Sequence, residues 1–505
     1  MKTKNFTRKN ATQFVPQNSF VGAMSVASNF TLTENGAVTN RSTLNDILDF
    51  FGAGGALRQR NEVDIINLFT RAYAQDRLLA MKILFYLRDI REGQGERRTF
   101  RTIYQYLANH YTDVARKNLE NVPFYGRFDD LYALVGTPLE SEAFALFATQ
   151  LKQDIRNMKA GKPVSLLAKW LKSENTSSAN SCRLGRKTRE AMELSPKRYR
   201  KILSALRKYI DVLEVKMCAG DWKEIDFERV PSKASLNYRK AFGRHDQERY
   251  AAYLNAVEKG EAKINAGAIY PYEIFRSLVL GSPSPLDIKQ ADVQWKAMPN
   301  WLEGNEHYGL VIADTSGSMV SNAGGLPILV SVSLAIYFAE RNVGPFKDHW
   351  LTFSDTPKWQ TLKGSNLYEK YQNIEKAHWG FSTNLQASFD LILSTAVSNR
   401  VPQKDMPAVL YIVSDMEFNA TGGQTNYDAI RQKYAAAGYK LPRIVWWNVN
   451  ARNDQFPIRS DATGTALVSG ASPSILKSLL SAKDFNPLSI VLETVNTERY
   501  ERVKV

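Results

Sequence analysis

The strongest constraint on the fold is a set of apolar runs in the last two-fifths of the chain. Four of them have strand length, at residues 308–313, 349–354, 407–414 and 443–449. Helical segments are expected between and after them, at residues 326–341, 384–397, 426–438 and 474–480. Strands that are apolar on both faces and alternate with helices are typical of a parallel sheet covered by helices. The sequence therefore predicts a doubly wound α/β domain over residues 286–505, after the linker Gly281–Pro285.

The preceding part of the chain has the period of amphipathic helices instead. Apolar residues recur at helical spacing, and we expect helices at residues 42–51, 64–73, 78–87, 97–110, 112–120, 127–135 and 141–158. Because helix follows helix with short turns, residues 43–285 are predicted to form an all-α HEAT-like solenoid or ring. Residues 1–42, rich in Asn, Thr and Ser, are expected to form an extended arm. The predicted fold class is α + α/β.

Oxygen-bearing side chains follow two strands of the predicted sheet. Asp314-Thr-Ser-Gly-Ser318 comes directly after the first strand, Asp415 ends another, and Thr383 lies in a loop before a helix. Loops at the carboxyl ends of parallel strands meet in one crevice. The sequence therefore predicts an all-oxygen site for a hard cation, Mg²⁺ or Mn²⁺. Its ligands would be Asp314, Ser316, Ser318, Thr383 and Asp415, whereas nearby Glu417 is expected to be an exposed loop residue.

The motif Asp314-Thr-Ser-Gly-Ser318 resembles the Asp-x-Ser-x-Ser signature of the metal-ion-dependent adhesion site of von Willebrand factor A (VWA) domains. Thr383 and Asp415 follow in the order of that family's other two ligands. The resemblance implies that the hydroxyls bind the metal and that the carboxylates bind it directly or through water. It also implies one open position for an acidic side chain of a protein partner. A VWA fold whose site is not used stays open as the alternative.

The excess of positive over negative charge lies entirely in the first three-fifths of the chain. Residues 1–300 hold 47 Lys and Arg against 32 Asp and Glu, a difference of +15, while residues 301–505 hold 19 of each. Such an uneven charge distribution is typical of a protein in which one domain binds a polyanion and the other domain is electrically neutral. The most basic segment, residues 183–208, is predicted to contact RNA, the alternative being a solvated helix face or a loop. Its cations are Arg183, Arg186, Lys187, Arg189, Lys197, Arg198, Arg200, Lys201, Arg207 and Lys208.

Four segments of the helical part resemble known proteins. They are Leu84–Arg98, Pro123–Leu131, Val230–Ala234 and Ala241–Asp246. The first resembles the Ro (TROVE-domain) RNA-binding proteins, and all four are more similar to related helical-plus-VWA proteins of the DUF2828 type. The resemblance to Ro implies a ring of helical repeats that is closed by the VWA domain. The ring would bind single-stranded RNA ends in its hole and structured RNA on its outer face. Within the first segment we expect a structural turn, in which arginines pair with Asp89, Glu92 and Glu96.

The sequence offers little for catalysis. None of the five histidines is paired at metal-ligand spacing, and Asp314 and Asp415 form the only candidate pair of carboxylates, fewer than metal-dependent phosphodiester cleavage needs. We therefore expect no enzyme. The leading hypothesis is an RNA-binding scaffold whose VWA domain closes the ring and binds Mg²⁺. The alternative is a metal-dependent protein–protein interaction module without a role in RNA binding.

The expected location is the cytoplasm, without membrane contact. Only two cysteines, Cys182 and Cys218, are present, which fits a reducing compartment. The N-terminal residues lack the apolar core of a secretory signal. The apolar stretch Leu326–Ala339 is too short to span a bilayer and is interpreted as a buried helix.

Overall fold

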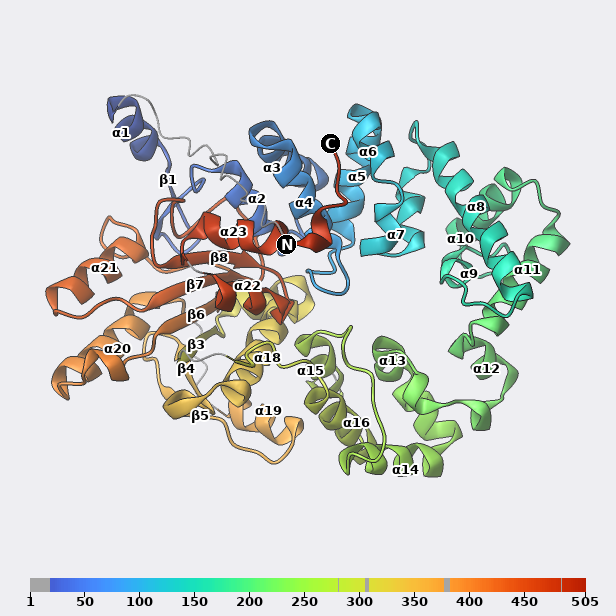
Figure 1. Cartoon of the computed structure of the whole chain (residues 1–505). Coiled ribbons are helices and arrows are strands. Elements are labelled where there is room, and N and C mark those ends of the chain that lie inside the picture. Colours follow the sequence, from blue (N-terminus) through green and yellow to red (C-terminus); the bar gives the residue numbers. More distant parts are fainter. Residues whose placement is uncertain (1–18, 280, 305–307, 377–381, 483) are drawn as a thin grey trace, which may run out of the picture.

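The structure is a computed structural model that describes residues 19–279, 281–304, 308–376, 382–482 and 484–505. A mostly helical part comes first and an α/β part follows, so the predicted α + α/β class is confirmed (Figure 1). Two segments used in the predictions lie outside the described residues. These are the first 18 residues of the expected arm and residues 380–381 of the loop before Thr383.

The helical part follows the apolar periods closely. Its first helices are α2 (Asp46–Gly54), α3 (Glu62–Gln75), α4 (Arg77–Arg88), α5 (Arg98–His110), α6 (Thr112–Lys117) and α7 (Asn121–Tyr125). Next come the 3₁₀ helix η1 (Phe128–Leu134), α8 (Glu140–Lys159), α9 (Leu167–Trp170), α10 (Ala179–Ala191), α11 (Pro196–Tyr209) and α12 (Leu213–Ala219). The short 3₁₀ turns η2 (Trp222–Glu224) and η3 (Phe227–Arg229) lead into α13 (Ser232–His245), α14 (Gln247–Glu258), α15 (Pro271–Val279) and α16 (Pro285–Lys296).

Local sequence explains where these helices begin. The side chain of Asp76 accepts a hydrogen bond from the Leu79 N–H at the start of α4, and Ser195 caps α11 with Pro196 in its first turn. Both arrangements satisfy or remove N–H groups that a helix leaves without a partner. The predicted helix at 127–135 is instead the 3₁₀ helix η1, in which Asp130 bonds back to the backbone of Arg127.

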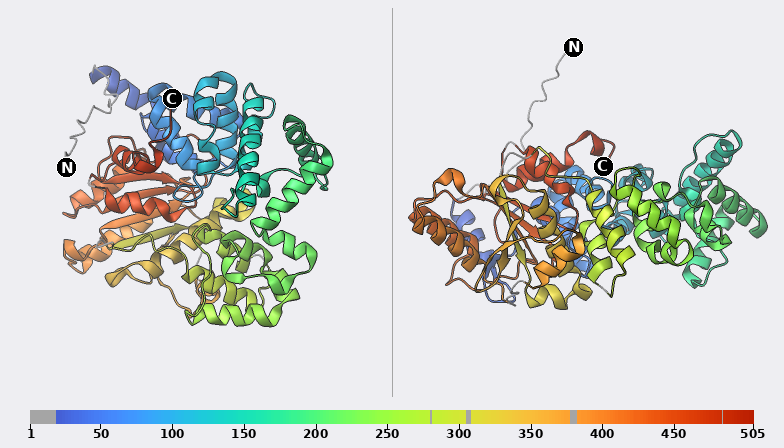
Figure 2. Two further views of the ribbon diagram at one scale, coloured as in Figure 1. Left: turned by 45° about the vertical axis from the view of Figure 1, so that its right-hand side comes forward. Right: turned by 90° about the horizontal axis from the view of Figure 1, so that it is seen from below.

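The helices form an arc whose two ends rest on the α/β part, so that the chain makes a closed circuit (Figure 1). At one end α2 packs on strand β8, and at the other α15 packs on α18. Figure 2 shows the same arc from two further directions. Helix α16 falls in the range predicted for the α/β domain, yet it packs on α13 and α14 as well as on α19.

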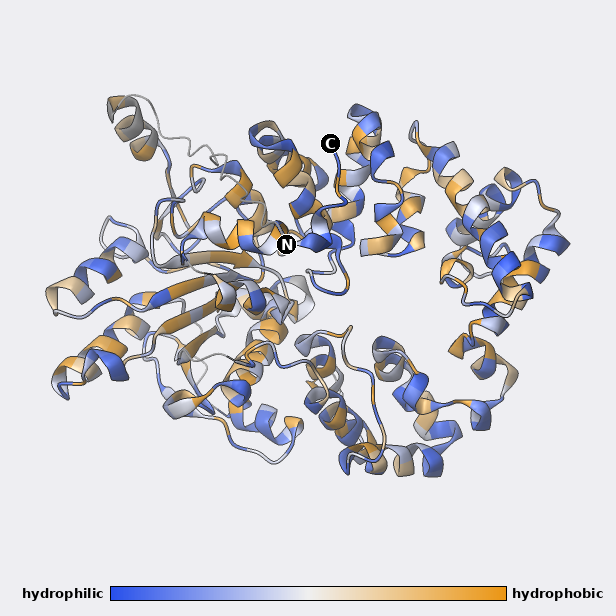
Figure 3. Ribbon diagram, viewed as in Figure 1, coloured by the Kyte–Doolittle hydropathy of each residue, from blue (hydrophilic) through white to orange (hydrophobic). Residues whose placement is uncertain are grey.

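The α/β part holds a six-stranded sheet with the order β5-β4-β3-β6-β7-β8. Its strands are β3 (Gly309–Asp314), β4 (His349–Phe353), β5 (Trp359–Thr361), β6 (Val409–Ser414), β7 (Arg443–Asn448) and β8 (Thr465–Ser469). All neighbours are parallel except β5, which is antiparallel to β4. Every residue of β3 and β6 is buried, as their apolar runs predict, and Figure 3 shows the strands as a continuous apolar layer.

Helices cover this sheet. They are α17 (Gly317–Ser321), α18 (Leu326–Arg341), α19 (Leu367–Glu375), α20 (Leu385–Ser398), α21 (Asn426–Ala436), α22 (Leu476–Ser481) and α23 (Pro487–Val495), with short 3₁₀ turns between some of them. Helix α18 packs on β3, β4 and β6, and α23 packs on β8. The chain leaves β3 for β4 on one side and later returns to place β6 on the other side. The carboxyl ends of β3 and β6 therefore meet at the topological switch point, where open α/β sheets bind ligands.

The N-terminal segment differs from the expected extended arm. Residues Ser19–Ser28 form helix α1, and this stretch is richer in the helix formers alanine and methionine than the residues around it. After it, β1 (Phe30–Leu32) and β2 (Val38–Asn40) pair antiparallel. We call residues 30–40 the strap. Isolated bridges join it to residues 419, 425 and 456, so the strap lies on the loops at the carboxyl end of the sheet.

Across the described ranges, no helix is both long enough and apolar enough to cross a membrane.

Candidate metal centre and basic surface

The two predicted carboxylates lie at adjacent strand ends and are both buried. Asp314 is the last residue of β3 and Asp415 follows β6, with 0% and 1% of their surfaces exposed. Oδ1 of Asp314 accepts the N–H of Ser316 at 2.9 Å, and Oδ2 accepts the hydroxyl of Ser414 at 2.5 Å. Burial, together with the nearby negative charge of Asp415, raises the pKa of Asp314 to about 7, although hydrogen bonds from Ser414 and Ser316 oppose the increase.

The two predicted serine ligands lie next to each other. Ser316 precedes the short helix α17, and its hydroxyl oxygen is 3.1 Å from that of Ser318. The hydroxyl of buried Thr383 donates to Oδ1 of Asn419 at 2.7 Å and accepts a hydrogen bond from the side chain of Asn35 at 2.8 Å. The contacts thus link Asp314 to Ser316, Ser316 to Ser318, and Thr383 to a neighbouring loop.

This donor set fits a hard divalent cation. Asp314 is a buried carboxylate that forms no ion pair with any side chain in the described part of the chain. A buried carboxylate next to a second one is costly unless positive charge compensates it. A cation bound by carboxylate and hydroxyl oxygens would supply that charge, and such oxygens are the ligands that Mg²⁺ and Mn²⁺ prefer. No cluster of three or more His, Cys, Asp or Glu ligands occurs among the described residues, so a bound cation would depend on the hydroxyls.

An arginine that no sequence pattern indicates, Arg452, pairs with Asp415. One guanidinium nitrogen of Arg452 lies 3.0 Å from Oδ2 of Asp415, and another lies 2.6 Å from a carboxylate oxygen of Glu34 in the strap. Arg452 is 16% exposed, which places this bridge at the edge of the site rather than in open solvent. The bridge ties the strap to a predicted metal ligand, and only the tertiary structure reveals it.

Glu417 is buried, which corrects the expectation of an exposed loop residue. It is 1% exposed, and one carboxylate oxygen accepts the backbone N–H of Glu34 at 2.8 Å. The other accepts the side-chain amide of Asn453 at 2.8 Å. The reason is the strap, which covers this loop. A loop position that would be exposed without the strap becomes an anchoring point for it.

The predicted RNA-contacting cations fall into two groups, those that pair with other groups of the protein and those that are exposed to solvent. Lys187 pairs with Glu140 at 2.6 Å and Arg189 pairs with Glu174 at 2.8 Å. Arg207 donates to the carbonyl oxygens of Ala168 and Leu171. The other predicted RNA-contacting residues are exposed on α10 and α11: Arg183, Arg186, Lys197, Arg198, Arg200, Lys201 and Lys208.

The aromatic residues between these cations differ in exposure. Tyr199 is buried and donates its hydroxyl to the Lys172 carbonyl, so its ring is not free to stack on a base. Tyr209 is 40% exposed and is the available aromatic ring of this segment.

The turn after α4 is held by internal contacts, but its ion pairs differ from those expected. Arg88 is buried and pairs with Asp130. Asp89 pairs instead with Arg499 near the end of the chain, and Glu96 pairs with Arg58. The expected partners were neighbours in sequence, whereas the folded chain supplies partners from distant positions, Arg58, Asp130 and Arg499. Arg88 is therefore a structural residue of the circuit.

These features define a class of protein, a helical circuit closed by a doubly wound α/β domain with buried carboxylate and hydroxyl side chains at its switch point. Residues 33–130 and 171–305 match the Domain of unknown function DUF2828, which confirms that part of the predicted resemblance, and residues 309–504 match the Domain of unknown function DUF7788. The chain belongs to the family of the uncharacterized protein L728 of Acanthamoeba polyphaga mimivirus. The two are 32% identical over 509 residues, which cover 93% of this chain and 87% of that protein.

A solved structure is also similar. The crystal structure of the Deinococcus radiodurans RO (RSR) protein covers 90% of this chain and 100% of its own, with a TM-score of 0.47 and 14% sequence identity.

Proposed function

We propose that this protein is an RNA-binding scaffold, and that its role is binding rather than catalysis. The observation that carries the proposal is the cluster of exposed cations on α10 and α11. They lie in the part of the chain that holds all of the +15 excess charge. We name the exposed residues Arg183, Arg186, Lys197, Arg198, Arg200, Lys201 and Lys208 the basic surface.

Phosphate chemistry explains why such a surface favours RNA. Lysine and arginine that contact phosphates release condensed counterions, and this release makes binding strong at low salt and weak at high salt. The exposed Tyr209 offers a ring on which an unpaired base can stack, which favours single-stranded segments or ends. A reducing compartment such as the cytoplasm, where RNA is present, fits the two free cysteines, Cys182 and Cys218.

In this proposal the α/β part closes the circuit and binds Mg²⁺ or Mn²⁺. Asp314 and Asp415 supply the negative charge, and Ser316, Ser318 and Thr383 supply hydroxyl oxygens. A divalent ion there compensates the buried carboxylates and rigidifies the loops on which the strap rests. The metal would thus stabilise the shape of the scaffold.

Charge reversal on the basic surface tests the RNA role. The variant with Arg198→Glu, Arg200→Glu and Lys201→Glu should lose at least tenfold in affinity for a labelled single-stranded RNA at low salt, since each contact to phosphate is lost. The matched control reverses three exposed lysines of the α/β part, Lys347, Lys404 and Lys440. Equal RNA affinity of the two variants, or a wild-type protein that binds no RNA, would reject the proposal.

A second candidate function is metal-dependent docking of a protein partner. The strap favours it, because the carboxylate of Glu34 binds Arg452, the same arginine that pairs with Asp415. A partner's acidic side chain would then bind where the strap now lies. This function would be supported over the first if the protein binds a partner protein and no nucleic acid copurifies with it. That binding should be lost when EDTA is added and in the variant Asp314→Asn.

A further inference from the structure

We propose that a cavity between α13, α14 and α16 binds a phosphate monoester, carried either by an RNA end or by a free nucleotide. The cavity measures about 590 Å³ and lies outside both the candidate metal centre and the basic surface. For an RNA end, the proposal rests on the RNA-binding function proposed above. For a free nucleotide, it stands without that function.

Two helices supply the positive charge of the cavity. Lys240 and Arg244 are exposed and lie one turn apart on α13, and neither forms an ion pair with a carboxylate among the described residues. Lys289 of α16 also lines the cavity, but it pairs with Glu258 at 2.8 Å. Lys240 and Arg244 are therefore the cations available to a ligand.

The one carboxylate of the cavity is neutralised. Asp287 is mostly buried, pairs with Arg239 at 2.8 Å and accepts the hydroxyl hydrogen bond of Ser284 at 2.8 Å. Arg239 and Asp287 cancel each other, as do Lys289 and Glu258. Two positive charges remain, which match the two negative charges of a phosphate monoester better than the single charge of a diester.

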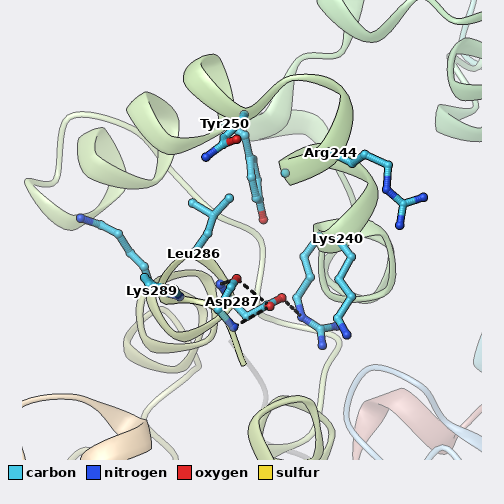
Figure 4. A pocket seen from close by; sticks show the side chains of 11 residues that line it. Lys240, Arg244, Tyr250, Leu286, Asp287 and Lys289 are labelled. Atoms are coloured by element: carbon cyan, nitrogen blue, oxygen red, sulfur yellow. Dashed lines mark hydrogen bonds and ion pairs between the residues drawn. The ribbon is translucent and has the colours of Figure 1, made fainter. Parts of the chain in front are cut away.

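A buried hydroxyl points into the same space. Tyr250 of α14 is 1% exposed, and its hydroxyl has no hydrogen-bond partner of normal geometry among the described residues. Figure 4 shows its ring entering the cavity between Leu286 and Lys240, with the hydroxyl directed toward Asp287. A buried donor without a partner is costly, so a ligand oxygen that accepts this hydroxyl would gain binding energy.

The backbone of α16 adds to the positive potential. This helix of 12 residues begins at Pro285, and its first residues line the cavity. Its N-terminus carries the positive end of the helix dipole, which favours an anion nearby. Two unpaired cations, an unpaired buried hydroxyl and a helix N-terminus thus meet around one open volume.

Binding measurements with matched ligands test the proposal. We would titrate the full chain with adenosine 5′-monophosphate and adenosine by calorimetry. One labelled oligoribonucleotide in 5′-phosphate, 3′-phosphate and unphosphorylated forms would be titrated by fluorescence anisotropy. We expect at least one phosphorylated ligand to bind about tenfold more tightly than its unphosphorylated counterpart, the effect of one or two charged hydrogen bonds.

Variants assign the effect to the cavity. Lys240→Gln with Arg244→Gln should abolish the preference for phosphate, and Tyr250→Phe should weaken it about threefold or more. Lys259→Gln, an exposed lysine after α14, is the matched control and should leave it unchanged. Both altered cations are exposed, so the double variant should keep the melting temperature of the wild type.

The outcomes separate this proposal from the RNA-binding function. Preference for the monophosphate alone, lost in the double variant, supports the cavity with a nucleotide as ligand even if no oligoribonucleotide binds. Equal binding of phosphorylated and unphosphorylated ligands overturns the cavity proposal, while tight binding of the unphosphorylated RNA would leave the scaffold function standing. A phosphate preference that persists in the double variant also overturns the cavity proposal.

Discussion

Arg452 pairs with the buried carboxylate of Asp415 at 3.0 Å, at the edge of the candidate metal centre. The same guanidinium holds Glu34 of the strap. The fixed positive charge of an arginine beside a metal site weakens the binding of a metal cation there, because the two positive charges repel each other. The charge balance of this centre therefore depends on Arg452 as well as on the predicted ligands.

Replacing Arg452 with glutamine should strengthen metal binding. Loss of the neighbouring positive charge should raise the affinity for Mn²⁺ about tenfold, and electron paramagnetic resonance of free Mn²⁺ measures that affinity directly. In EDTA the same variant should melt earlier than the wild type, because Asp415 then lacks a counter-ion. Arg459→Gln, which removes a partly exposed arginine of the same loop, is the control. Unchanged Mn²⁺ affinity in Arg452→Gln would contradict the prediction.

The end of the chain should stabilise the helical part through one ion pair. Asp89 is fully buried after α4 and accepts hydrogen bonds from Arg499, one of them at 2.7 Å, and from the hydroxyl of Tyr500 at 3.1 Å. Arg499→Ala leaves this carboxylate buried without a cation, which should cost about 3–5 kcal/mol of unfolding free energy. Urea denaturation measures the loss.

A second substitution distinguishes the loss of the ion pair from a general disruption of the C-terminal residues as the cause of the lower stability. Asp89→Asn in the Arg499→Ala background removes the charge that lacks a partner, and should restore part of the stability. Equal stability of the single and double variants would show that the buried charge is not the cause.

The position of the candidate site at the carboxyl ends of β3 and β6 could be predicted, because the sequence patterns that mark it are local. Uninterrupted apolar runs mark both strands, and parallel strands bring Asp314 and Asp415 to one edge of the sheet. The contacts of Glu34 with Arg452 and Glu417 could not be predicted in this way. They join residues more than 380 positions apart, and no periodic pattern encodes such a pairing.

In the basic segment, too, the sequence predicts the general feature but not the role of each residue. Composition predicts a cationic surface but treats all lysines and arginines alike. Arg207 lies on the side of α11 that packs on α9, whereas Arg200 and Lys201 lie on the exposed side. Helical periodicity could have separated them, since Tyr199, Leu203 and Leu206 mark the buried face of α11.

Arg207 should therefore matter for stability and not for RNA contact. Its guanidinium donates to the carbonyls of Ala168 and Leu171, both at 2.9 Å, and to the hydroxyl of Ser173 at 3.0 Å. Arg207→Met removes these charged hydrogen bonds and should cost about 3 kcal/mol. Lys208→Met, at the exposed next position, should change stability little. Lower RNA affinity in Arg207→Met without a lower melting temperature would contradict this assignment.

Asp49 should make the stability of the fold depend on pH. It is fully buried in α2, and burial raises its pKa from 3.8 to about 6, although hydrogen bonds from Ser42 and Thr43 oppose the increase. Below about pH 4 the carboxyl is protonated in both the folded and the unfolded chain, so no penalty arises. Between about pH 4 and 6 the unfolded chain loses this proton first, and the folded state loses stability as pH rises.

Above about pH 6 the loss is complete, and a difference of about two between the pKa values corresponds to about 3 kcal/mol. Urea denaturation at several values from about pH 4 to 7 should therefore show a smaller fall in stability for Asp49→Asn than for the wild type. Asp46→Asn, at a partly exposed carboxylate in the first turn of the same helix, is the matched control and should keep the wild-type slope. The slope is the quantity to compare, because an amide at position 49 also changes hydrogen bonds at every pH. Equal slopes in the wild type and Asp49→Asn would mean that the buried carboxyl does not govern stability in this pH range.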